Sequence, residues 1–249
     1  MRRRVMSGWT TIEMGGKPAD VFEPSGGKSF GRAVLYLHDH DLATLKDNTA
    51  FTAELQNHGL PAVCPHGGRS WWLDRICPEF DGSITPMAHL LNGVVPWISE
   101  RWNVQPPAIG LIGIGMGGQG ALQLAYRHAR LFPVVAAISP AVDFHDLHGL
   151  GLPLDEMFTS AEAARQETAT LNLHPLNWPR HQLIVCDPAD ADWFEGCERL
   201  ASKLYSMGIP FESDLETTAG GHDWRYFNAM APRAIGFVDE RLGSEMPRS

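Results

Sequence analysis

Short apolar runs alternate with amphipathic stretches along most of this chain. The apolar runs predict strands over residues 33–37, 62–65, 108–114, 133–138, 182–186 and 211–215. Helical spacing of apolar residues predicts helices over 44–58, 87–102, 119–130, 193–207 and 224–241. Pro96 is expected to kink the second of these or to split it in two. Strands that alternate with helices favour crossover connections, so we expect an α/β fold with a mostly parallel central sheet flanked by helices.

Two segments depart from this alternation. Residues 8–24 alternate apolar and polar positions around Gly15-Gly16 and predict an antiparallel hairpin at the sheet edge. Residues 141–179 are rich in His, Pro, Gly and Asp, and we expect a short cap over the carboxyl ends of the strands, where open α/β sheets bind ligands. A purely structural excursion is the alternative. Without a linker or repeat, residues 1–249 are predicted to form a single domain.

Composition narrows the class of protein. The 249 residues are 44% hydrophobic and 20% charged, which suits a folded domain with a large core. The formal net charge of −9 argues against a nucleic-acid partner, since phosphates attract a basic surface. No apolar stretch reaches the roughly 20 residues of a membrane span and no secretory signal is readable, so we expect no membrane partner and a cytoplasmic location. The four cysteines are expected to be reduced, mostly buried thiols.

The segment Gly113-Ile-Gly115-Met-Gly117 lies between a predicted strand and a predicted helix. This is the place and the glycine spacing of the G-x-S-x-G nucleophile elbow, a strained turn that exposes a catalytic serine. The flanking glycines allow the tight turn, but the position of the serine holds Gly115. The following helix directs its free N–H groups, that of Met116 included, at this position, which favours binding of an oxyanion.

An acid and a histidine follow the elbow in the chain order of a catalytic triad. Asp190 comes after the predicted strand 182–186 and is expected to orient the histidine. Asp187 and Asp192 are the alternatives, although the first suits a turn and the second suits a helix cap with Glu195. His222, in the loop Gly-Gly-His-Asp-Trp before the last helix, is expected to act as the general base.

The loop after the predicted strand 33–37 begins His38-Asp39-His40. Hydrolases with a nucleophile elbow draw their second oxyanion N–H from this place, so Asp39 and His40 are assigned to the oxyanion hole. His38 and two consecutive tryptophans, Trp71 and Trp72, are expected to bind substrate, because aromatic rings cover much apolar ligand surface. For the two tryptophans, a core anchor is an equally good interpretation.

The histidines also raise the question of a metal site. His38 and His40 share one face of a strand-like segment, but two ligands alone are too few. His145, Asp146 and His148 of the predicted cap could complete a ligand set only if folding brings them close. We therefore predict no metal and no cofactor.

Taken together, these segments resemble bacterial esterases of the α/β-hydrolase superfamily, of the esterase D and S-formylglutathione hydrolase type. The resemblance is carried by residues 34–38, 110–122, 186–190 and 220–224 and spans nearly the whole domain. It implies the α/β-hydrolase fold and cofactor-free hydrolysis of a carboxylic ester or thioester, with a small-molecule ester or acyl ligand as partner. By the same resemblance Asp190 is the acid, His222 the base and the Met116 N–H an oxyanion donor. Formation of a homo-oligomer is left open.

Gly115 matches the nucleophile position of these esterases and departs from it. Glycine has no side chain with which to form an acyl-enzyme. Three interpretations stay open: a serine exchanged for glycine on purpose, a natural homologue that binds a ligand without turnover, or hydrolysis by a water that His222 activates in the space of the missing hydroxyl. A substitute nucleophile elsewhere fits less well, because none of the candidates lies in an elbow: Ser70, Ser139 and Cys186.

A different class of protein shares one motif with this chain. Gly113-x-Gly115-x-x-Gly118 satisfies the dinucleotide-binding fingerprint and lies between a strand and a helix. The fingerprint normally follows the first strand, with an acid at the end of the next one. Neither condition holds here, so a dinucleotide-binding protein is the remote alternative.

Overall fold

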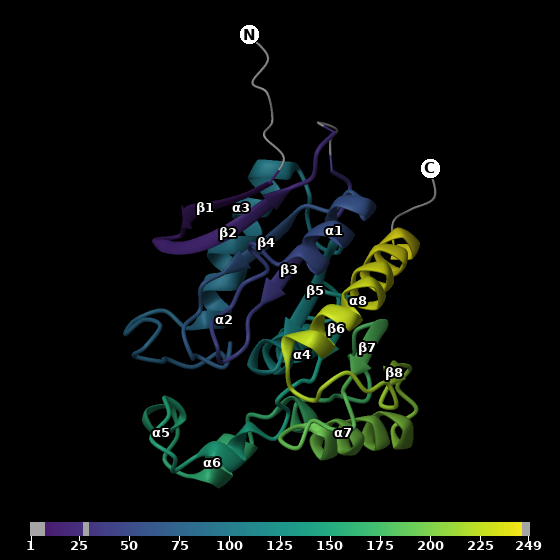
Figure 1. The fold of residues 1–249 in the computed structure, drawn as a ribbon. Helices are drawn as coiled ribbons and strands as arrows, with labels where there is room; N and C mark the ends of the chain where they lie inside the picture. The colour runs from purple at the N-terminus through teal and green to yellow at the C-terminus, as the bar shows by residue number, and fades with distance from the viewer. Residues whose placement is uncertain (1–7, 27–29, 246–249) are drawn as a thin grey trace.

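Eight strands form one sheet in the computed structural model, which describes residues 8–26 and 30–245 (Figure 1). The strands are β1 (Gly8–Met14), β2 (Lys17–Glu23), β3 (Ala33–Leu37), β4 (Ala62–Pro65), β5 (Ile109–Ile114), β6 (Val134–Ile138), β7 (His181–Val185) and β8 (Glu212–Asp214). They lie in the order β1-β2-β4-β3-β5-β6-β7-β8. Strand β2 is antiparallel to β1 and β4, and the other neighbours are parallel. The predicted sheet with its edge hairpin is confirmed.

The direction in which the sheet grows reverses at β3. Strand β3 pairs with β4 on one side and with β5 on the other, so the chain first extends the sheet one way and then the other. In open α/β sheets, ligands bind outside the carboxyl ends of the strands at such a reversal. The loops after β3 and β5 therefore flank the place where a site is expected.

Helices cover both faces of the sheet and bury a separate hydrophobic core on each (Figure 1). The pair α1 (Thr49–His58) and α8 (Trp224–Glu245) covers one face. The other face is covered by α2 (Pro86–His89), the π-helical turn η1 (Leu90–Val94), α3 (Val95–Trp102), α4 (Met116–Arg127) and α7 (Phe194–Ser206). The parallel strands are buried on both faces, which explains their unbroken apolar sequence.

Two helices begin or bend at places that differ from the expectation. Helix α1 starts at Thr49 rather than at residue 44, because the Asn48 side chain accepts the Phe51 N–H and caps the first turn. In the stretch 86–102 the π turn over Leu90–Val94 separates α2 from α3, which begins at Val95, one residue before the proline. Pro96 lies in the first turn of α3, where a missing N–H costs little.

The segment between β6 and β7 holds only short helices. They are η2 (Phe144–Leu147), α5 (Leu154–Met157), α6 (Ala161–Arg165) and η3 (Ala169–Leu171), and Figure 1 shows α5 and α6 lying apart from the sheet. The segment is tied to α4, since Gln119 Oε1 accepts the Ala169 N–H at 2.9 Å and Arg127 pairs with Glu167 at 2.8 Å. Its role as a cap stays a prediction.

Two further features bear on the expectations from composition. Cys64, Cys77, Cys186 and Cys197 are all buried and unbridged in the described part of the chain. Among the residues described, none of the helices combines the length and the apolar character that crossing a membrane requires.

Candidate active site

Strand register brings two distant loops together at the carboxyl edge of the sheet. Leu37 of β3 pairs with Gly113 of β5 in parallel register. Asp39 and Gly115 each lie two residues beyond this pair, so the two loops leave the sheet side by side. Because neighbouring strands lie about 5 Å apart, a side chain from one loop can reach the backbone of the other.

Gly115 occupies the strained turn that the elbow motif predicts. Its backbone has φ +52° and ψ −116°, a conformation that residues with a side chain rarely adopt. Its N–H donates to Ile138 O at 3.0 Å, and its carbonyl accepts the N–H groups of Gln119 and Ala141. A Cβ on Gly113 would overlap the Gly117 carbonyl, so the close packing of β5 against α4 requires a glycine at this position.

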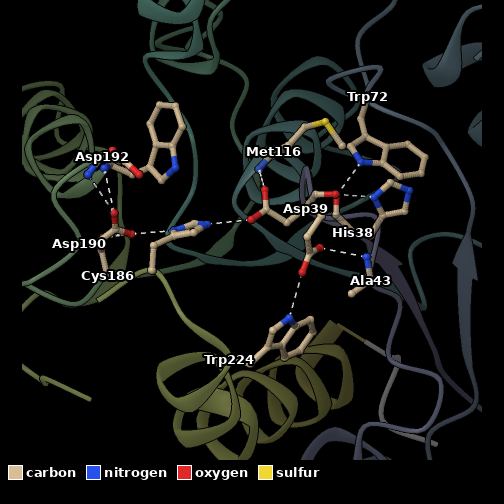
Figure 2. A network of polar contacts seen from close by, with 12 residues as sticks. His38, Asp39, Ala43, Trp72, Met116, Cys186, Asp190, Asp192 and Trp224 are labelled. Atoms are coloured by element: carbon tan, nitrogen blue, oxygen red, sulfur yellow. Dashed lines mark hydrogen bonds and ion pairs between the residues drawn. The ribbon is translucent and has the colours of Figure 1, made fainter. Parts of the chain in front are cut away.

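The Asp39 carboxylate fills the space that a serine side chain would take. A Cβ built on Gly115 would overlap this carboxylate. Asp39 Oδ1 accepts the Met116 N–H at 2.7 Å, and Oδ2 accepts a hydrogen bond from His222 Nε2 at 2.7 Å (Figure 2). The sequence assigned Asp39 to the oxyanion hole through its loop N–H. The structure places the Asp39 side chain against the Met116 N–H, where Gly115 leaves room for it, and the predicted role of the loop N–H stays a prediction.

His222 lies between two carboxylates. Its Nδ1 donates to Asp190 Oδ2 at 2.9 Å, opposite the contact with Asp39. The side chain of Asp190 is fully buried, while those of Asp39 and His222 keep 13% and 22% of their surface exposed. The Asp39–His222 contact is therefore partly open to solvent, whereas Asp190 is not.

The two carboxylates set the charge of the ring. Burial disfavours the charged ring, but the hydrogen bonds to Asp190 and Asp39 outweigh it and raise the pKa of His222 to about 10. Burial would likewise raise the pKa of Asp39, but the hydrogen bond and charge of His222 and the N–H groups of Met116 and His40 lower it. At neutral pH the site holds an imidazolium between two carboxylates. In this protonated form His222 can donate a proton, and its predicted role as a general base stays a prediction.

Two acids after β7 fix the position of the histidine loop. Besides its bond to His222, Asp190 uses Oδ1 to accept the Trp193 N–H at 3.1 Å. Asp187 accepts N–H groups from Ala219 and Gly221 at 2.6 and 2.8 Å and so ties the histidine loop to the end of β7. Asp190 is thus the acid that contacts the ring, and Asp187 supports the loop that carries it.

His38 and Trp72 contact the backbone of the loop that carries Asp39. The Trp72 indole N–H donates to the His38 carbonyl at 3.1 Å (Figure 2). The ring of His38 donates from Nδ1 to Asp39 O at 2.7 Å and accepts the Gly67 N–H at Nε2. Both side chains are buried and hold the loop that carries Asp39. Their predicted contact with substrate stays a prediction.

Trp71 and His40 form the next layer toward the segment between β6 and β7. The Trp71 ring is 1% exposed and packs between the rings of His40 and Phe144, at centroid distances of 6.1 and 5.1 Å. Within residues 8–26 and 30–245, Trp71 Nε1 and His40 Nε2 are buried without a hydrogen-bond partner. Substrate contact by Trp71 and an oxyanion role for His40 stay predictions as well.

The histidines and acids considered for a metal do not gather. Over the described residues, no group of three or more side chains has the spacing to hold a metal ion. His148 Nε2 lies 3.0 Å from the Phe158 carbonyl, and His38 uses both ring nitrogens in the hydrogen bonds given above.

Comparisons with known proteins identify a family and similar folds. The model of a family described as "Putative esterase" matches residues 28–237. The fold is similar to an S-formylglutathione hydrolase from Agrobacterium tumefaciens, with 15% identity, a TM-score of 0.79 and coverage of 98% of this chain and 99% of that one. An S-formylglutathione hydrolase from Staphylococcus aureus is 14% identical, with a TM-score of 0.74 and coverage of 93% of this chain and 98% of that one. A ferulic acid esterase is 16% identical, with a TM-score of 0.73 and coverage of 94% of this chain and 97% of that one. A search of curated proteins finds no match.

Proposed function

Because this chain belongs to that esterase family and has the α/β-hydrolase fold, we propose that it hydrolyses a small carboxylic ester or thioester. The observation that carries the proposal is the set of contacts around position 115. There, hydrogen bonds of 2.7 to 2.9 Å join Asp190 to His222, His222 to the Asp39 carboxylate, and this carboxylate to the Met116 N–H.

Each of these groups has a part in cleaving an acyl bond. The Met116 N–H, at the start of the 12-residue helix α4, is suited to stabilise a developing oxyanion. His222 as an imidazolium is suited to protonate the departing alcohol or thiol. Asp190 holds the ring in orientation. Asp39 supplies a negatively charged oxygen next to His222, where a serine at position 115 would have its hydroxyl.

One observation favours a second candidate, a homologue that binds a ligand without turnover. Asp39 Oδ1 already occupies the Met116 N–H, as the carboxylate of a bound product acid would. If the Asp39 carboxylate only blocked the Met116 N–H, the chain would not hydrolyse esters. The ester assay below separates the two candidates.

The test compares two histidine–aspartate pairs in the same chain. His58 makes a pair of the same length as His222, 2.9 Å to Asp239, between α1 and α8. We expect the native chain to hydrolyse p-nitrophenyl acetate or an acetyl thioester. His222→Ala should lower kcat/KM by about 10²–10⁴-fold, because it removes the general acid, and His58→Ala should leave it unchanged. No hydrolysis by the native chain, or equal rates in both variants, would contradict the proposal.

A further inference from the structure

The carboxylate at the elbow is placed to react as well as to fill space. Its two oxygens have different partners: Oδ1 is held by the Met116 N–H, and Oδ2 by His222 Nε2, each at 2.7 Å. Oδ2 thus takes the place of a serine hydroxyl next to the histidine, and Oδ1 lies at the helix N-terminus where an oxyanion would be stabilised. No catalytic serine or cysteine lies at this turn, since position 115 is glycine.

We propose that Asp39 is the nucleophile of this site and that hydrolysis proceeds through a covalent acyl-aspartyl intermediate. The inference rests on the proposed function and names the residue that does the work of the missing serine. Carboxylates act as nucleophiles in other hydrolytic enzymes, so the chemistry is within reach of an aspartate.

In the first step the Asp39 carboxylate attacks the acyl carbon of the ester or thioester. A lone pair on Oδ2 forms the new C–O bond, and the bond from the acyl carbon to the alcohol oxygen or thiol sulfur breaks. The departing group takes the Nε2 proton of His222. The products of this step are an acyl-aspartyl anhydride, a free alcohol or thiol and a neutral His222.

In the second step the neutral ring can act as a base. His222 takes a proton from water, and the hydroxide attacks Cγ of Asp39. The charge then develops on Oδ1, which already accepts the Met116 N–H, and this contact is the reason for attack at Cγ rather than at the substrate carbon. The bond between Cγ and Oδ2 breaks, and Oδ2 leaves with the acyl group as a carboxylate. The proton on the new oxygen of Asp39 goes to solvent. Asp39 is again a carboxylate, and His222 is again protonated.

Direct attack by a water that His222 activates fits the structure less well. The space next to Gly115 is filled by the Asp39 carboxylate. His222 is already a cation, since the two flanking carboxylates raise its pKa to about 10. It becomes a base only after it has given a proton to a leaving group, which requires that another group attack first.

A single-turnover experiment in H₂¹⁸O tests the proposal on the native chain. The enzyme is mixed in excess with p-nitrophenyl acetate, and both the acetate and the proteolytic peptide that contains Asp39 are analysed by mass spectrometry. We expect one ¹⁸O atom in the Asp39 side chain and none in the acetate of the first turnover. Asp41 lies in the same peptide and bonds to Trp224 Nε1 at 3.0 Å, so fragment ions that separate Asp39 from Asp41 provide an internal control.

The outcomes distinguish this proposal from the one on which it rests. Acetate that carries ¹⁸O in the first turnover, with unlabelled Asp39, would mean that water attacks the acyl carbon. Hydrolysis would then stand, and the proposed route through attack at Cγ of Asp39 would be overturned. Label in Asp41 to the same extent as in Asp39 would overturn it as well. If no acetate is released, both the nucleophile and the proposed function fail.

Discussion

A side chain at position 115 would overlap the Asp39 carboxylate, so the effect of a substitution at one of these positions depends on the residue at the other. Gly115→Ser alone should not create a serine esterase, because its Cβ would overlap the Asp39 carboxylate and its backbone would be held at φ +52°. We expect this variant to lose stability and ester hydrolysis. Urea unfolding and the p-nitrophenyl acetate assay measure the two effects.

Removing the competing carboxylate should reverse this result. In Gly115→Ser with Asp39→Gly, the serine hydroxyl can contact His222 and the Met116 N–H is free for an oxyanion. We expect a fluorophosphonate to label Ser at position 115 in the double variant but not in the single one. Equal labelling of both would show that the two residues do not share a volume.

The charge of His222 makes stability depend on pH. Its pKa in the folded chain is about 10, above the ordinary value of about 6.5, so its protonation stabilises the fold fully below pH 6.5 and the contribution is lost as pH rises through 10. The groups that face it are Asp39 and Asp190, with Cys186 Sγ 3.7 Å from the latter. Between these pH values the free energy of unfolding should fall by up to about 1.4 kcal/mol per pH unit.

Urea unfolding of the native chain and of His222→Gln measures this contribution. The difference in stability between the two should shrink steadily from pH 6.5 to pH 10. A difference that stays constant over this range would show that the ring is not a cation in the folded chain.

At the scale of elements, the elbow depends on the close approach of α4 to its neighbours. A Cβ on Gly120 of α4 would overlap Trp72, which supports the loop of Asp39. Gly120→Ala should therefore destabilise the chain by about 1–3 kcal/mol and reduce ester hydrolysis.

Another helical glycine offers the matched control. A Cβ on Gly236 of α8 would meet nothing closer than His58 at 4.0 Å, so Gly236→Ala should gain about 0.5–1 kcal/mol from helix propensity. Both changes are read from urea unfolding. A similar effect of the two substitutions would remove the packing argument for Gly120.

The elements themselves were largely predictable from sequence. Strands that are buried on both faces read as apolar runs, and the predicted sheet with its antiparallel hairpin is the sheet observed. Helix α1 was placed five residues too early, because the capping contact of Asn48 outweighs helical periodicity upstream. The π turn over Leu90–Val94 leaves no mark in a periodicity pattern, so only Pro96 indicated that this helix is interrupted.

At the scale of the whole molecule, the site depends on contacts that sequence spacing cannot give. The order of elbow, acid and histidine was readable because each lies in a recognisable loop after a strand. The place of the Asp39 side chain was not, because it depends on β3 and β5 being neighbours in a register that pairs Leu37 with Gly113. Asp39 lies two residues past Leu37 of β3, and Gly115 lies two residues past Gly113 of β5. Only this register shows that the carboxylate of the first fills the space left by the second.

The most direct measurement of the central claim is kcat/KM for ester hydrolysis in Asp39→Asn and Asp41→Asn, two isosteric changes in one loop. Asp39 contacts His222 and the Met116 N–H, whereas Asp41 accepts hydrogen bonds from Trp224 and Ala43. If Asp39 replaces the missing serine, Asp39→Asn should lower kcat/KM by about 10³-fold or more and Asp41→Asn should leave it unchanged. Equal rates in the two folded variants would contradict the account.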